Sequence, residues 1–71
     1  MNAPYHINRA KLQEIKERRR LTNRAIAEAS GLHADTVAAF VNGLRTGCTE
    51  QTAFSLASAM DCQTSDFADR R

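Results

Sequence analysis

The strongest constraint on the fold lies in residues 21–43, LTNRAIAEASGLHADTVAAFVNG, where signals that start and stop helices follow one another at short intervals. Thr22 can cap a helix that starts at the next residue. Gly31 can end that helix, because glycine readily adopts the left-handed conformation found at helix C-termini. Gly43 supplies a second stop signal, and His33 stands at the cap position before it. The segment therefore predicts two short helices joined by a tight turn, over residues 23–30 and 34–42.

The rest of the chain also carries helix signals and few strand signals. Asn8 and Thr49 each stand at a cap position ahead of an apolar stripe of helical period. They predict helices that end near Arg20 and Met60, and a last short turn covers residues 65–68. The chain holds twelve alanines, and it has no stretch in which apolar and polar residues strictly alternate. The predicted fold class is therefore all-α, a compact bundle of five short helices.

The charged residues are unevenly distributed along the chain. Residues 1–45 contain eight Lys or Arg and four Asp or Glu, a net charge of +4, whereas residues 46–71 carry a net charge of −2. A basic front and an acidic rear favour a protein that presents one face to an anion. Small asymmetries of this kind are also common in domains that bind no anion. The charge pattern alone leaves both interpretations open.

Residue combinations suited to catalysis or metal binding are not found. The sequence has no paired carboxylates, no nucleophile with an obvious base and no glycine-rich phosphate loop. Cys48 and Cys62 do not stand at ligand-like spacing from His6 or His33, so a zinc site is not expected. We expect both cysteines to be reduced rather than joined in a disulfide. The sequence therefore predicts no enzyme activity, no cofactor and no small-molecule substrate.

Within residues 7–69 the chain resembles the Cro/C1-type (lambda repressor-like) helix-turn-helix domains of phage repressors and bacterial regulators. The matching residues are Leu21-Thr22, Ile26-Ala27, Gly31-Leu32, Thr36-Val37 and Asn42-Gly43. Farther along, Leu56-Ala57, Ala59-Met60 and Phe67 stand where the family has its fourth and fifth helices. The resemblance implies a helix-turn-helix at about residues 22–42, with residues 34–42 as the helix that reads DNA.

Candidate DNA contacts follow from the resemblance and from the position of each residue in the helix-turn-helix. The residues expected to face base edges are Ala34, Asp35, Ala38 and Ala39. The residues expected to face phosphates are Asn23, Arg24, His33, Thr36, Asn42 and Arg45. The alanines can offer only methyl contacts, and Asp35 can accept a hydrogen bond from the cytosine amino group. Sequence choice could then be modest and rest partly on DNA shape or on the N-terminal arm.

One position departs from the family pattern. Relatives often carry Glu just before the Asn-Gly pair and pair it with a basic residue of the first helix. Here Val41 takes the place of that Glu, and Lys16 stands at the basic position. The ion pair therefore cannot form, which leaves Lys16 free for solvent or phosphate.

The function predicted from these observations is a double-stranded-DNA-binding transcriptional regulator of phage or bacterial type. We expect an N-terminal arm over 1–7, the helix-turn-helix domain over 8–69 and a tail over 70–71. With no second domain in this sequence to sense a ligand, repression by promoter occlusion is expected. We also expect a homodimer that associates near Phe54 and residues 61–69. No secretory signal or membrane span is found, which predicts a cytoplasmic protein. The alternatives are a protein-interaction module and a DNA-architecture or recombination factor.

Overall fold

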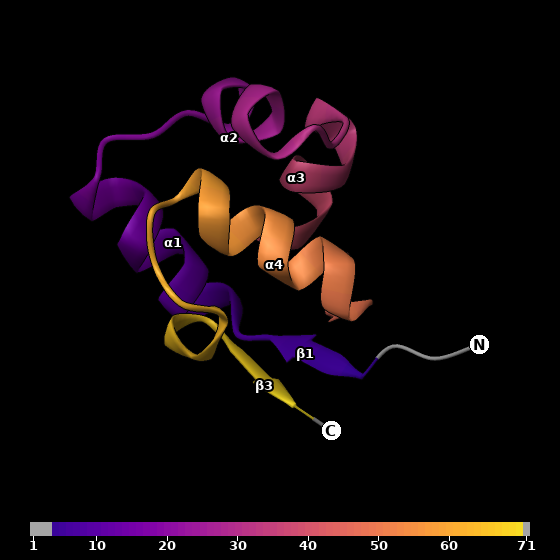
Figure 1. Ribbon diagram of the computed structural model, residues 1–71. Helices are drawn as coiled ribbons and strands as arrows, with labels where there is room; N and C mark the ends of the chain where they lie inside the picture. Colours follow the sequence, from indigo (N-terminus) through magenta and orange to yellow (C-terminus); the bar gives the residue numbers. More distant parts are fainter. Residues whose placement is uncertain (1–3, 71) are drawn as a thin grey trace.

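The computed structural model describes residues 4–70, which form four α-helices, one short 3-10 helix and three short β-strands. In chain order these are β1 (Tyr5–Ile7), α1 (Arg9–Arg18), α2 (Asn23–Ser30), α3 (Ala34–Val41), β2 (Gly47–Cys48), α4 (Glu50–Ala59), the 3-10 helix η1 (Thr64–Asp66) and β3 (Ala68–Arg70). Helix α2 packs against both α3 and α4, and the strands lie at the opposite end of α1 from α2 (Figure 1). None of the helices in residues 4–70 is long and apolar enough to cross a membrane.

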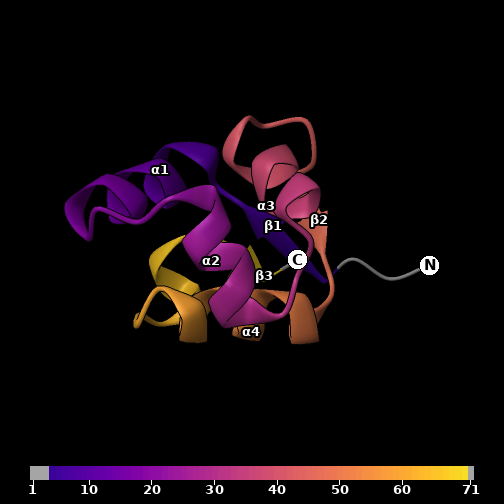
Figure 2. The same cartoon turned by 90° about the horizontal axis from the view of Figure 1, so that it is seen from above.

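The strands form an antiparallel sheet that corrects the predicted fold class (Figure 2). β1 is the central strand, in which Tyr5 lies opposite Cys48 of β2 and Arg70 of β3. The fold is therefore not all-α with five helices, and the last predicted turn is the 3-10 helix η1. Strands of two or three residues are too short to show an alternating pattern, and they pair with positions far away in the sequence.

The sheet also includes residues that were expected in the terminal segments. Tyr5–Ile7 were assigned to an N-terminal arm and Arg70 to a tail, but they form β1 and the end of β3. Tyr5 and Ile7 are buried in the core, so this part of the chain belongs to the folded body. Residues 1–3 and 71, which complete the predicted arm and tail, lie outside the described residues.

The predicted helix caps of α1, α2 and α4 are confirmed. The side-chain oxygens of Asn8, Thr22 and Thr49 each accept a hydrogen bond from the backbone N–H three residues later, at 3.0–3.2 Å. Each bond satisfies an N–H that has no partner within its own helix. His33 precedes α3 as predicted, but its side chain makes no capping hydrogen bond. Three of the four helix starts are thus fixed by residues that the sequence identifies.

Two helix ends differ slightly from the predicted positions. α1 ends at Arg18 rather than near Arg20, and α4 ends at Ala59 rather than near Met60. After each helix a residue other than glycine adopts a left-handed conformation, with φ +55° at Arg20 and +53° at Asp61. The following backbone N–H donates back into the last turn, at 2.9 and 3.0 Å, as in a Schellman motif. Without a glycine the sequence gives no signal for these ends.

The hydrophobic core contains residues from all four α-helices and from the sheet. The largest side chains that are at most 2% exposed are Phe40, Phe67, Ile7, Leu12, Ile26, Leu56, Met60 and Val37. No charged or polar residue is buried among the described residues. Leu44 and Phe54 are the large apolar residues of 4–70 that remain exposed, at 83% and 52%.

Candidate nucleic-acid interface

Helices α2 and α3 form a helix-turn-helix unit around Gly31. Gly31 has a φ of +78°, and its N–H donates to the Ala27 carbonyl at 2.9 Å, which ends α2. The Ser30 hydroxyl then accepts a hydrogen bond from a backbone N–H of the turn at 3.2 Å. Ile26 of α2 and Val37 of α3 are each 1% exposed and belong to the same core. The turn therefore has the conformation that the sequence of residues 21–43 predicts.

Helix α3 has a buried face and an accessible face. The buried face consists of three large apolar side chains: Val37, Phe40 and Val41. The four residues predicted to face bases do not belong to it: Ala34 and Asp35 are exposed, and Ala38 and Ala39 are half-buried. The accessible face therefore offers methyl groups and one carboxylate. Such a face can pack closely against another surface, but it carries no positive charge of its own.

Four of the residues predicted to face phosphates lie in the first turns of α2 and α3 or at their caps. Arg24 is exposed, and its Nε lies 3.9 Å from the carboxylate of Glu28. Asn23 is half-buried, and its Oδ1 atom is fully buried without a hydrogen-bond partner in residues 4–70. His33 is exposed, and Thr36 is half-buried. These side chains come from the two helix N-termini, where backbone N–H groups favour an anion.

The other two, Asn42 and Arg45, lie just beyond the C-terminal end of α3, and both are exposed. Here the chain leaves the helix through Gly43, which has a φ of +77°. The next backbone N–H donates to the Ala39 carbonyl at 2.9 Å, which completes a Schellman motif. The Arg45 guanidinium lies over the Phe40 ring, 5.3 Å from its centroid. This cation–π contact holds Arg45 close to the end of α3.

Two side chains of α1, which sequence reasoning did not select, contact the same end of α3. Gln13 Nε2 donates to the Val41 carbonyl at 2.6 Å, and Arg9 Nη1 donates to the Asn42 carbonyl at 3.4 Å. Arg9 and Gln13 are four residues apart, so they lie on one face of α1. That spacing is the sequence signal that could have indicated a shared partner.

The hydrogen bond from Gln13 to the Val41 carbonyl links α1 to α3 at the position where relatives often have an ion pair between side chains. Val41 is 7% exposed, so its apolar side chain is buried where the resembled family often has a charged one. Lys16 is half-buried, and no carboxylate of residues 4–70 lies within 4 Å of its ammonium group. Helices α1 and α3 are thus joined by a bond from a side chain to the backbone rather than by an ion pair.

Two glycine substitutions test the contact of Arg9 with the end of α3. A Cβ at Gly43 would lie 2.8 Å from the Arg9 Cδ atom, whereas a Cβ at Gly31 would meet no atom within 4 Å. Alanine at either position suffers left-handed strain of about 1–2 kcal/mol. We expect Gly31→Ala to lower the free energy of unfolding by this amount and Gly43→Ala to lower it slightly further, because the flexible Arg9 side chain must move aside and give up its contact with Asn42. Urea denaturation measures both values. In an Arg9→Ala background the two substitutions should have equal effects, and a remaining difference would contradict the contact.

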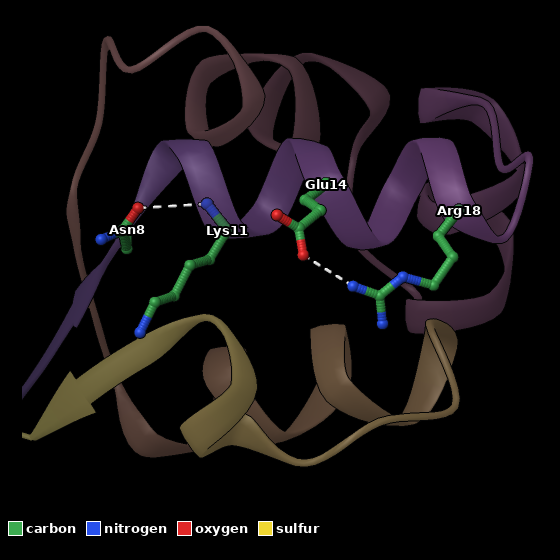
Figure 3. A network of polar contacts seen from close by, with 4 residues as sticks. All are labelled: Asn8, Lys11, Glu14 and Arg18. Atoms are coloured by element: carbon green, nitrogen blue, oxygen red, sulfur yellow. Dashed lines mark hydrogen bonds and ion pairs between the residues drawn. The ribbon is translucent and has the colours of Figure 1, made fainter.

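Two arginines of the run at the end of α1 form ion pairs with acidic side chains. Arg18 Nη2 lies 2.6 Å from Glu14 Oε1, one helical turn earlier (Figure 3). Arg19 Nη1 lies 3.7 Å from Asp61 Oδ2, which follows α4. Exposed pairs of this kind contribute little to stability. They do place a negative charge beside Arg18 and Arg19, which lowers the positive potential at this end of α1.

The cysteines are free thiols, as expected from the sequence. Burial raises the pKa of the Cys48 thiol, and the nearby charge of Arg45 offsets this only in part. Burial, followed by the Asp66 carboxylate, raises the pKa of the Cys62 thiol. Both thiols therefore stay protonated at neutral pH and are poor nucleophiles. In residues 4–70 no three His, Cys, Asp or Glu side chains are grouped so that they could hold a metal ion.

The fold has a counterpart among solved structures. The chain is similar to the crystal structure of the restriction-modification controller protein C.AhdI from Aeromonas hydrophila, with a TM-score of 0.74 and 24% sequence identity. The match covers 82% of this chain and 86% of that chain. No protein-family model matches the sequence, and no curated protein matches it either. The comparison therefore shows that this chain and the controller protein share a fold.

Proposed function

We propose that this protein is a double-stranded-DNA-binding transcriptional regulator, and more specifically a phage or bacterial repressor that acts in the cytoplasm by occluding a promoter. The observation that carries the proposal is the accessible face of α3, which belongs to a helix-turn-helix unit that also carries cationic side chains. Arg24 lies in the first turn of α2, and Arg45 lies beyond the end of α3. The similarity in fold to a restriction-modification controller protein supports the same conclusion.

In the proposed complex α3 lies in the major groove and α2 lies across the sugar–phosphate backbone. Ala34, Ala38 and Ala39 then pack against thymine methyl groups, and Asp35 accepts a hydrogen bond from a cytosine amino group. The residues proposed to contact phosphates are Asn23, Arg24, His33, Thr36, Asn42 and Arg45. Phosphate contacts of this kind supply affinity and fix the register of the protein, but they carry no sequence information themselves.

We further propose that the protein binds its operator as a homodimer. Phe54 of α4 is 52% exposed, and its ring packs against Tyr5 with the centroids 6.4 Å apart. A shallow hollow beside Phe54 is lined by residues of α4 and of the segment 62–65. An exposed aromatic side chain in a less basic part of the chain suits a protein contact better than a DNA contact. A symmetric dimer would double the few contacts that one α3 can make.

A selection experiment tests this proposal. The protein is titrated against a pool of random-sequence duplexes in a fluorescence-anisotropy assay at several salt concentrations, and the bound fraction is sequenced. We expect the logarithm of the association constant to fall with the logarithm of the salt concentration, with a slope of about −0.9 per phosphate contacted. We also expect an inverted repeat with half-site centres about one helical turn apart.

Other outcomes would point to the alternatives. Salt-sensitive binding without an enriched sequence, accompanied by DNA bending, would favour an architectural factor. An absence of binding at low salt would contradict the proposal and favour a protein-interaction module with a helix-turn-helix fold. Binding to an enriched site without inverted symmetry would agree with a DNA-binding regulator and contradict the proposed homodimer.

A further inference from the structure

The arginines of this chain differ in whether a carboxylate neutralises them. Arg18, Arg19 and Arg24 each lie within 4 Å of an acidic side chain. Four other arginines, Arg9, Arg20, Arg45 and Arg70, are exposed, and no carboxylate of residues 4–70 lies within 4 Å of any of them. Two of these four guanidinium groups, those of Arg9 and Arg45, are found at the C-terminal end of α3. That end of α3 therefore carries two positive charges that no nearby carboxylate offsets.

The position of Arg9 is not explained by the stability of its own helix. Arg9 is the first residue of α1, whose first turn contains no acidic residue. A cation is unfavourable at this end of a helix, because the helix dipole is positive there. The Arg9 side chain instead extends over Gly43, where no Cβ obstructs it, and reaches the Asn42 carbonyl. Its charge therefore lies at the negative end of α3.

The contacts of Arg9 leave most of its donors for a ligand. A guanidinium carries five N–H donors in a planar fork that matches two phosphate oxygens. Arg9 uses one of them for the Asn42 carbonyl, and that bond is long, at 3.4 Å. Gln13 holds the neighbouring Val41 carbonyl at 2.6 Å, so the turn and the helix that carries Arg9 are fixed relative to each other. A phosphate that reaches Asn42 and Arg45 would therefore meet a guanidinium already in position.

We infer that Arg9 binds a DNA phosphate, together with Arg45, at the Asn42–Gly43 turn that follows α3. The inference rests on the proposed function, and it extends the interface from the helix-turn-helix unit to the N-terminal end of α1. Neither the charge pattern along the sequence nor the resemblance to a family indicated this residue.

The test compares Arg9→Gln with Arg18→Gln in the full chain. Both variants remove one arginine from α1 and change the net charge equally, but Arg18 is paired with Glu14 at the far end of the helix. The association constant for the selected duplex is measured by anisotropy at a series of salt concentrations. The slope of the logarithm of the association constant against the logarithm of the salt concentration should become shallower in Arg9→Gln, by about 0.9 for each arginine removed from the complex. Arg18→Gln should keep the wild-type slope. Arg9→Lys keeps the charge and should also keep the slope.

A purely structural role for Arg9 predicts a different result. Loss of a contact with the end of α3 would lower the melting temperature, measured by circular dichroism without DNA, and leave the slope unchanged. Equal slopes for wild type, Arg9→Gln and Arg18→Gln therefore overturn the inference and leave the proposed function in place. An absence of DNA binding by the wild-type protein overturns the proposed function and the inference with it.

Discussion

Replacement of Ile7 by alanine is expected to lower the free energy of unfolding by about 2–5 kcal/mol. Ile7 is 2% exposed and belongs to the central strand of the sheet, where its N–H donates to the Thr46 carbonyl at 2.7 Å. The substitution leaves a cavity between the sheet and the helices. Single domains are stable by only about 5–15 kcal/mol, so the variant should retain little of its stability. Urea denaturation followed by circular dichroism measures the change.

A matched control separates this effect from any change at the surface. Ile7→Val removes one methyl group and keeps the branching that suits a strand, so it should cost only about 0.5–1.5 kcal/mol. If Ile7→Ala lowered the free energy of unfolding by less than about 0.5 kcal/mol, residues 5–7 would behave as a free arm, as the sequence predicted. The experiment thus decides between the two descriptions of this segment.

Replacement of Ala34 by glutamate is expected to weaken DNA binding by about 2 kcal/mol, or roughly thirtyfold, without loss of stability. Ala34 is the exposed first residue of α3, and a carboxylate in the first turn of a helix is favourable by about 0.3–1 kcal/mol. In the proposed complex the same carboxylate would face base edges and lie close to phosphates, beside Asp35. The stability of the protein should therefore stay the same or rise slightly, while its affinity for DNA falls.

Anisotropy titration against the selected duplex and thermal melting measure these two effects separately. Arg18→Gln serves as the control, because it changes the net charge of the protein equally and lies at the C-terminal end of α1, paired with Glu14. Ala34→Glu should bind far more weakly than this control. If the two variants bound DNA with equal affinity, the N-terminal end of α3 would not be part of the interface.

The sequence predicted the helical part of the fold from local signals. Asn8, Thr22 and Thr49 are strong cap residues, and Gly31 and Gly43 adopt the left-handed conformations expected of them. These features depend on neighbouring residues, so a single sequence reveals them. The helix ends at Arg20 and Asp61 were less certain, because residues other than glycine adopt the left-handed conformation there.

The features that were missed depend on long-range contacts. Tyr5 pairs with Cys48 and Arg70, and the residues around these three positions give no signal that predicts the pairing. The contacts of Arg9 and Gln13 with α3 also join distant segments through backbone carbonyls, which every residue possesses. The candidate DNA contacts followed from position in the helix-turn-helix, which gives no information about Arg9 and Gln13 of α1.

The pairing of β1 with β3 has a consequence for protein engineering. Tyr5 and Arg70 lie opposite each other, so the polypeptide enters and leaves the folded body through adjacent strands (Figure 1). Chain ends that lie close together are the condition under which circular permutation and insertion into a host protein are tolerated. This unit could therefore be placed within a surface loop of a carrier protein with short linkers, and its α3 would stay accessible on the helical side.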